Sequence, residues 1–225
     1  MRVSRERAQA TREHIKRTAA ALFRERGFDG IGVADLMKAS GLSHGGFYRH
    51  FASKEDLAVE ASNAAYEQFV GDAENRSIEA LLSRYISKEH RDDLATGCPM
   101  ATLGGEAVRQ SEQVKAIFAN GIETWIGMIG DAFGAADMEP AEKRASSIEL
   151  AARAVGAIVL SRAASSDSSL SEEILDICRA VCLADAAKHN DGPAQLATAP
   201  SPQAKSKARP QEAEKNNKRH KNQAA

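Results

Sequence analysis

The sequence predicts an all-α protein in two parts, an N-terminal helix-turn-helix domain of three helices and a larger helical domain. Apolar residues recur every three or four positions up to about residue 190, whereas the alternation typical of strands is nearly absent. Serine, proline or glycine stands at several expected helix ends. We expect domains over residues 1–54 and 55–190. A disordered basic tail is expected over 191–225, which has almost no bulky apolar residue.

The first helix is expected from Thr11 to Arg26. Its apolar residues share one helical face and are Ile15, Ala19, Leu22 and Phe23. Gly27 ends the helix, because glycine adopts positive φ easily. Two short helices follow, over 33–40 and 43–50, with Gly41 as the turn between them. Their expected inward-facing residues are Val33, Leu36, Met37, Phe47 and Phe51.

Two serines are expected to cap helices in this region. Ser43 can cap the helix that it begins. Ser53 and Asp56 have the spacing of a capping box, in which the serine oxygen accepts an exposed backbone N–H and the acid reaches back. The box predicts a long helix from Lys54 to about Ala73.

The rest of the chain up to residue 190 is expected to continue as helices. The expected segments are 77–90, 99–109, a helix capped by Ser111, 140–163 and one that begins at Ser171 and ends near Lys188. Pro99 suits a first helical turn. The helix after Ser111 has apolar residues spaced for burial, namely Val114, Ile117, Phe118, Ile122, Trp125, Ile126 and Ile129.

Charge is unevenly distributed along the chain. Residues 1–54 hold 11 Lys and Arg against 5 Asp and Glu, and residues 61–190 hold 12 against 20. This pattern favours a polyanionic partner for the N-terminal part. Residues 191–225 are basic again, with 7 against 3. We read them as a solvated tail, with added non-specific affinity for nucleic acid as the alternative.

Composition argues against other protein classes. No apolar run approaches the ~18 residues that span a bilayer, and the N-terminus has no secretory signal. The cysteines are Cys98, Cys178 and Cys182; they lack metal spacing and fit a reduced cytoplasm. We therefore expect a cytoplasmic protein that has no membrane partner, cofactor or metal.

The short segment that opens at Ser43 has a surface that its packing does not require. Gly45 and Gly46 lower helix propensity by roughly 1 kcal/mol each relative to alanine. That cost is understandable if the backbone must approach a phosphate or a base edge. The remaining surface is polar, aromatic and basic, with His44, Tyr48, Arg49 and His50. These features are typical of a helix that enters the major groove of DNA.

Flanking residues extend this candidate interface. Lys54 lies at a predicted helix N-terminus, where N–H groups and the dipole favour a phosphate. The arginines Arg2, Arg5, Arg7 and Arg12 would form an arm or flank on the phosphates or the minor groove. The alternative is a plain three-helix segment with a solvated basic face.

The segment GLSHGGFYRHFASKEDL, preceded by ALFRERGFDGIGVADLMKASG, resembles the N-terminal DNA-binding domain of the TetR family of transcriptional repressors. The resemblance covers about residues 10–60. It implies an all-helical homodimer in which two DNA-binding domains join a larger ligand-binding and dimerisation domain. Such a protein binds a palindromic operator in double-stranded DNA and leaves it when a small organic effector binds.

The resemblance also assigns residues. It implies base and backbone contacts by Ser43, His44, Gly45, Tyr48 and His50, with Lys54 as a phosphate anchor and Phe47 and Phe51 buried. The sequence departs from the family pattern at Gly32, where Thr or Ser usually caps the helix and contacts phosphate. Backbone N–H groups of Gly32 and Val33 would replace that contact. His44 stands where Lys is frequent, so the base preference does not carry over.

In the larger domain, the last two helices are rich in alanine and aliphatic residues. The resemblance favours a four-helix dimer interface built from this pair in two subunits, and the alternative is packing inside one subunit. An effector cavity is expected between the middle helices. Its candidate lining residues are Tyr66, Phe69, Tyr85, Met100, Leu103, Phe118, Trp125 and Met128.

Cys98 offers an alternative sensing chemistry. It lies in Gly-Cys-Pro-Met at an expected helix start, where the helix dipole lowers a thiol pKa. The motif resembles one found in part of the family, in which some members sense reactive compounds. Cys98 is therefore a candidate sensor of oxidants or electrophiles, and the plain alternative is a small buried residue at a helix cap.

Two further classes of function are alternatives to DNA binding. No nucleophile, base and orienting carboxylate can be assembled, and no glycine-rich phosphate loop follows a strand, so we do not expect an enzyme. A module that binds an acidic protein is the second alternative. Only a DNA reader combines a steep loss of affinity with salt and a preference for one palindrome. Repression is the family's usual mode, although these residues do not separate it from activation.

Overall fold

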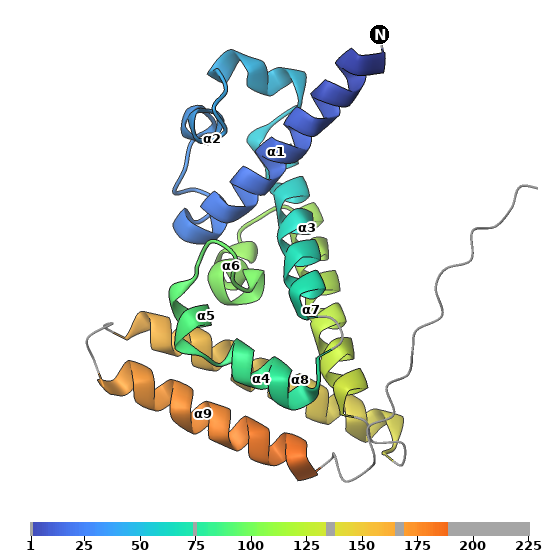
Figure 1. The fold of residues 1–225 in the computed structure, drawn as a ribbon, viewed down its shortest axis with the longest axis vertical. Helices are drawn as coiled ribbons and strands as arrows, with labels where there is room; N and C mark the ends of the chain where they lie inside the picture. Colours follow the sequence, from blue (N-terminus) through green and yellow to red (C-terminus); the bar gives the residue numbers. More distant parts are fainter. Residues whose placement is uncertain (1, 74–75, 134–137, 165–168, 189–225) are drawn as a thin grey trace, which may run out of the picture. The chain divides into compact units, whose positions relative to one another are not determined.

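A computed structural model describes residues 2–73, 76–133, 138–164 and 169–188, with side chains from Ser4 onward. These residues are helical and contain no β-strand, as predicted (Figure 1). The elements are α1 (Arg2–Arg26), α2 (Val33–Ala39), the 3₁₀ helix η1 (His44–Arg49), α3 (Lys54–Ala73), α4 (Ile78–Tyr85), α5 (Lys88–Asp92), α6 (Pro99–Ala107), α7 (Glu112–Ala132), α8 (Pro140–Ala163) and α9 (Ser169–Lys188). The predicted tail over 191–225 lies outside the described residues.

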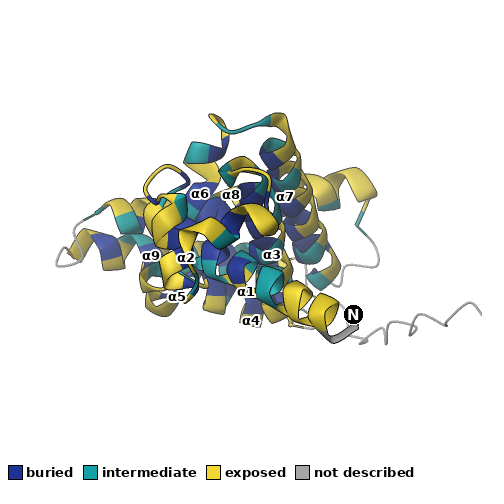
Figure 2. Ribbon diagram, turned by 90° about the horizontal axis from the view of Figure 1, so that it is seen from above, coloured by how far each residue is buried: buried dark blue, intermediate teal, exposed yellow. Residues whose placement is uncertain are grey.

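We call residues 2–54 the head and residues 55–188 the body. In the head, α1 begins about nine residues earlier than predicted. Its first turns are made of good helix formers rather than an apolar face, and the Gln9 side chain donates to Glu13 at 3.1 Å. Figure 2 shows this end of α1 as exposed. The expected N-terminal arm is therefore part of a helix.

The third element of the head also differs from the prediction. It is a 3₁₀ helix, and the Ser43 side chain makes no capping hydrogen bond. Two adjacent glycines lower the propensity for an α-helix here. Gly41 does make the preceding turn, with φ of +70°.

The capping box at the start of α3 is confirmed. The Asp56 N–H donates to Ser53 Oγ at 3.0 Å, and the Ala52 N–H donates to Asp56 Oδ2 at 3.0 Å. The helix that follows has the predicted bounds, Lys54–Ala73. It packs against α1 in the head and against α7 in the body, so this one helix connects the two parts.

In the body, α8 packs along α9 and α7, and α6 packs against α7 and α8 (Figure 1). The starts of α7 and α8 agree with the prediction, and Ser111 caps α7. Ile122 was expected to be buried but is 43% exposed. Ser171 was expected to begin the last helix, which instead starts at Ser169. The Ser171 hydroxyl is buried, where it donates to the Ser161 carbonyl at 2.7 Å.

The segment 77–90 was predicted as one helix, but it is broken between α4 and α5. The backbone leaves helical geometry at Ile86, and Ser87 caps α5 by accepting from the His90 N–H at 3.1 Å. The His90 ring fixes this break. Its Nε2 accepts from the Cys98 N–H at 2.9 Å, so its Nδ1 carries the proton and donates to the Tyr85 carbonyl at 2.6 Å.

Among the described helices, none combines the length and the apolar character that crossing a bilayer requires.

Stability should depend on pH through His90. Burial, with a smaller contribution from Arg162, lowers the pKa of His90 from 6.5 to about 4. Between these values the unfolded chain binds a proton that the folded chain excludes, so stability should fall as pH falls from about 6.5 to about 4, by about 2–3 kcal/mol. Urea unfolding across this range measures the loss.

The matched variants are His90→Asn and His44→Asn, the second of which changes an exposed histidine. His90→Asn should be less stable at neutral pH and should lose most of the dependence between pH 6.5 and 4. His44→Asn should keep it. If the stability of both variants depended equally on pH, His90 would be ruled out as the source of that dependence.

Candidate nucleic-acid interface and body pockets

Two phenylalanines hold η1 on the head while its other side chains face outward. Phe47 and Phe51 are buried, with ring centroids 5.7 Å apart. Between them Tyr48 is 67% exposed and lies edge-on to the Phe47 ring. The remaining predicted reader residues are also accessible: Ser43, His44 and Gly45 are exposed, and Gly46 and His50 are half-buried. The structure therefore brings the predicted reader residues onto one short accessible segment.

The glycines in this segment are not needed for internal packing. A Cβ atom added at Gly45 would have no neighbour within 4 Å, and one at Gly46 would make ordinary contacts. Neither residue has a positive φ. Gly32, at the start of α2, has the same open space, and no side chain caps that helix. Small residues at these places leave the backbone open to an outside partner.

Lys54 is half-buried at the first position of α3. It also borders a hollow of about 470 Å³ at the junction of head and body, beside Phe28 and Arg109.

The arginines predicted as a flank separate into two kinds. Arg5 and Arg7 are exposed along α1. Arg12 is instead half-buried: its guanidinium is paired with Glu60 and lies 4.3 Å from the centroid of the Phe51 ring. Arg12 thus joins α1 to α3 and braces the ring that anchors η1. We therefore assign Arg12 to the support of the interface rather than to phosphate contact.

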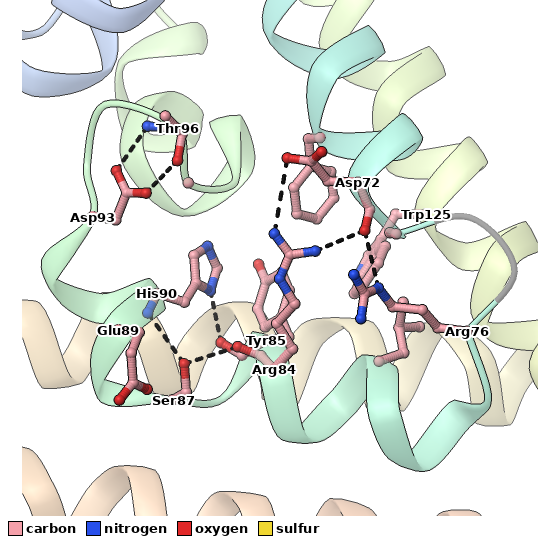
Figure 3. Close-up of a pocket in the computed structure, with 14 residues that line it drawn as sticks. Asp72, Arg76, Arg84, Tyr85, Ser87, Glu89, His90, Asp93, Thr96 and Trp125 are labelled. Carbon is pink, nitrogen blue, oxygen red and sulfur yellow. Dashed lines mark hydrogen bonds and ion pairs between the residues drawn. The ribbon is translucent and has the colours of Figure 1, made fainter.

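A pocket of about 150 Å³ opens in the body among α3, α4, α5, the loop before α6, and Trp125 of α7 (Figure 3). Of the predicted ligand residues, Phe69, Tyr85 and Trp125 line it. Trp125 is also part of a larger apolar hollow of about 610 Å³ between α6, α7 and α8, together with Met100 and Phe118. The other three candidates, Tyr66, Leu103 and Met128, line neither of these pockets.

The polar wall of the smaller pocket was not predicted. Asp72 lies between two arginines, and its carbonyl accepts from Arg84 Nη1 at 2.7 Å and from Arg76 Nε at 3.0 Å (Figure 3). Glu89, His90 and Asp93 add charged and polar groups to the lining, and Ser87 and Thr96 add hydroxyls. The charged residues and His90 occupy exposed or half-buried positions of helix ends and a loop. Such positions have no periodic signal, so they could not be identified before the structure was known.

Three aromatic rings form the floor of this pocket. The rings of Tyr85 and Trp125 are stacked with centroids 5.0 Å apart, and Phe69 lies 5.1 Å from Trp125. Tyr85 and Trp125 are almost completely buried. Burial, followed by the nearby Cys98, raises the pKa of Tyr85 well above its usual value, so its hydroxyl stays protonated.

The prediction of an activated thiol at Cys98 is wrong for this conformation. Cys98 does stand at the start of α6, but its side chain is fully buried and makes no capping hydrogen bond. Burial raises the pKa of the Cys98 thiol. The cost of desolvating a thiolate thus outweighs the helix dipole on which the prediction relied.

The helices α8 and α9 pack together within the chain and still leave apolar side chains outside. On α8, Val159 and Leu160 are 42% and 59% exposed, and on α9, Ile177 and Val181 are 55% and 42% exposed. This pair therefore forms part of the core of one chain and also retains an apolar surface suited to a further partner.

The sequence of this chain is similar to those of known transcriptional regulators. Residues 15–61 match the sequence model of bacterial regulatory proteins of the tetR family, and residues 75–173 match that of the C-terminal domain of LmrA/YxaF-like transcriptional regulators. The transcriptional repressor NemR of Escherichia coli is 29% identical over 132 residues, which cover 54% of this chain and 66% of NemR. The transcriptional regulator LmrA of Bacillus subtilis is 26% identical, with 71% of this chain and 90% of LmrA covered.

Solved structures show the same fold. The crystal structure of reduced E. coli NemR has a TM-score of 0.61 at 23% identity and covers 77% of this chain and 95% of NemR. AibR in complex with isovaleryl coenzyme A and operator DNA has a TM-score of 0.53 at 19% identity, with 76% and 97% covered. With an exposed helix-turn-helix segment and both halves of the chain matched, the protein belongs to the TetR family of transcriptional regulators.

Proposed function

We propose that this regulator is a repressor that binds a palindromic DNA operator as a homodimer and is released by a small organic effector. The observation that carries the proposal is the exposure of η1 between its two buried anchors, Phe47 and Phe51. The name of the related repressor NemR and the operator complex of AibR support it. Such a protein acts where bacterial operators lie, in the cytoplasm.

Each exposed group of η1 suits a type of DNA contact. Tyr48 can stack on a sugar or touch a thymine methyl, while its hydroxyl reaches a phosphate. His44 and His50 flank it, and Gly45 lets the backbone approach. Lys54, with the N–H groups at Gly32 and Val33, would hold phosphates on either side. Arg5 is free to add a contact from the outer end of α1.

Two copies are needed to read a palindrome. The exposed apolar residues of α8 and α9 would pack against the same surface of a second chain, which gives an isologous interface. The two copies of η1 must then lie about 34–36 Å apart to enter successive major grooves. An effector releases DNA if it favours a dimer with a different spacing.

The structure contains contacts that would transmit such a change. Arg24, only 3% exposed at the end of α1, donates to the Gly97 carbonyl at 3.2 Å, and Gly97 lines the smaller pocket. Next to it, Glu106 of α6 accepts from the Phe28 N–H at 2.8 Å. A Cβ at Gly27, where φ is +79°, would overlap the Glu106 carboxylate, so head and α6 meet closely. We propose that these contacts couple the smaller pocket to the head.

The proposed reader can be tested with Tyr48→Ala and Lys54→Ala. Each variant should bind the protein's own promoter about tenfold more weakly, because each removes a direct contact with DNA. Lys54→Ala should also lower the slope of log affinity against log salt by about one, since it releases one fewer counterion. Affinity is measured by fluorescence anisotropy over a salt series, and dimerisation by sedimentation.

The control is Lys188→Ala, which changes an exposed lysine at the end of α9. It should bind DNA as the unaltered protein does. Unchanged affinity in both reader variants would remove η1 from the interface.

The coupling can be tested with Glu106→Ala. Trp125 is the single tryptophan of the chain and lines the pocket, so its fluorescence reports on the body. Operator binding to the head should change that emission, because coupling between sites is reciprocal. At saturating DNA, the change in Trp125 emission should be at most half as large in the Glu106→Ala protein as in the unaltered protein. Glu67→Ala, which removes an exposed carboxylate from α3, should keep all of it. A full change in the Glu106 variant would show that another contact carries the signal.

A further inference from the structure

The floor of the smaller pocket contains buried hydrogen-bond donors that lack a strong acceptor. Among the described residues, five buried side-chain polar atoms make no well-formed hydrogen bond, namely Arg24 Nε, Ser62 Oγ, Tyr66 Oη, Tyr85 Oη and Trp125 Nε1. Two of these atoms belong to the stacked floor residues Tyr85 and Trp125. An unpaired buried donor is costly, so each calls for an explanation.

Both floor residues present a proton that a strong acceptor would satisfy. The indole N–H of Trp125 is a donor with no acceptor capacity. The Tyr85 hydroxyl stays protonated, and its one side-chain hydrogen-bond contact within the described part of the chain is with the buried neutral thiol of Cys98, which accepts only weakly. Nearby carbonyls are already engaged: the Tyr85 carbonyl accepts from His90, and the Gly97 carbonyl accepts from Arg24.

Size and charge restrict what could bring the acceptor. A cavity of about 150 Å³ is of the size that holds a benzene ring. Its lining carries Asp72, Glu89 and Asp93 against Arg76 and Arg84, and the arginines already donate to Asp72. With His90 neutral, the wall has no excess of positive charge for an anion. The aromatic floor favours a flat apolar ring.

We propose that the effector is an uncharged ketone with a single aromatic ring, whose ring packs on the floor of Phe69, Tyr85 and Trp125 and whose carbonyl oxygen accepts from Tyr85 Oη and Trp125 Nε1. This assignment rests on the proposed function, because it names the ligand class of the effector pocket.

The geometry also explains why such a ligand would act on the head. Neither donor atom is exposed, and the two rings are stacked 5.0 Å apart. The ketone reaches the donors by separating the Tyr85 ring from the Trp125 ring. Tyr85 ends α4 and its carbonyl holds His90, which in turn receives the Cys98 N–H at the start of α6. Movement of Tyr85 is thereby passed to the helix whose Glu106 contacts the head.

The test uses two pairs of compounds that differ at the carbonyl: acetophenone with ethylbenzene, and 1-indanone with indane. Binding to the full-length dimer is followed by Trp125 fluorescence and confirmed by calorimetry. Each ketone should bind roughly tenfold more tightly than its hydrocarbon, as one or two good hydrogen bonds would give. Equal affinity within both pairs, or no binding by any of the four compounds, would overturn the proposal.

Two hydroxyl deletions provide the matched variants. Tyr85→Phe removes a floor donor, and Tyr66→Phe removes another unpartnered buried hydroxyl that does not line the pocket. The Tyr85 variant should bind the hydrocarbons normally but show less than about a threefold preference for ketones. Tyr66→Phe should keep the full preference, as should Cys98→Ser, because no covalent step is involved. Loss of the preference in Tyr66→Phe as well would also overturn the proposal.

The two proposals fail separately. If Tyr48→Ala and Lys54→Ala weaken operator binding but no ketone preference exists, only the ligand class is wrong. If the ketones bind as described but the protein recognises no operator, the ligand class stands and the proposed function fails.

Discussion

The anchoring of η1 by Phe47 and Phe51 is the constraint on which the other features depend. With these rings buried, the residues between and before them must face outward, including Tyr48. Arg12 braces the arrangement from α1, because it lies over the Phe51 ring and pairs with Glu60 of α3. The same helix α3 then continues into the body. A surface suited to DNA is thus fixed by packing rather than by a flexible loop.

A second set of contacts joins the head to the body pocket. Arg24 and Glu106 connect the end of α1 to Gly97 and α6, and burial lowers the pKa of Arg24 to about 10, which leaves it charged at neutral pH. His90 links α4 to the start of α6 from the other side. The pocket wall and the head are therefore connected through hydrogen bonds to backbone groups, whose geometry tolerates little displacement. Such a connection suits a regulator that must convert a local change into a new head position.

The sequence predicted the helices whose signals are local. Ser53 and Asp56 identified the start of α3, and Gly27 marked the end of α1. The start of α1 was missed because its first turns are polar and lack an apolar period. The break at Ile86 was missed because neither glycine nor proline marks it, and it depends on His90. The surroundings of Arg12 and Cys98 could not be predicted for a related reason. Arg12 pairs with Glu60, and burial raises the pKa of the Cys98 thiol that the helix dipole was expected to lower. Both effects arise only in the folded chain.

The central claim, that η1 enters the DNA major groove from both halves of a dimer, can be measured directly by photo-crosslinking. A benzophenone side chain at position 48 should react with operator DNA at two places one helical turn apart, about 10 base pairs, on the same face of the duplex. The same group at position 181, on the exposed face of α9, should react with the second protein chain instead. Crosslinks to DNA from position 181, or none from position 48, would contradict this account of the protein.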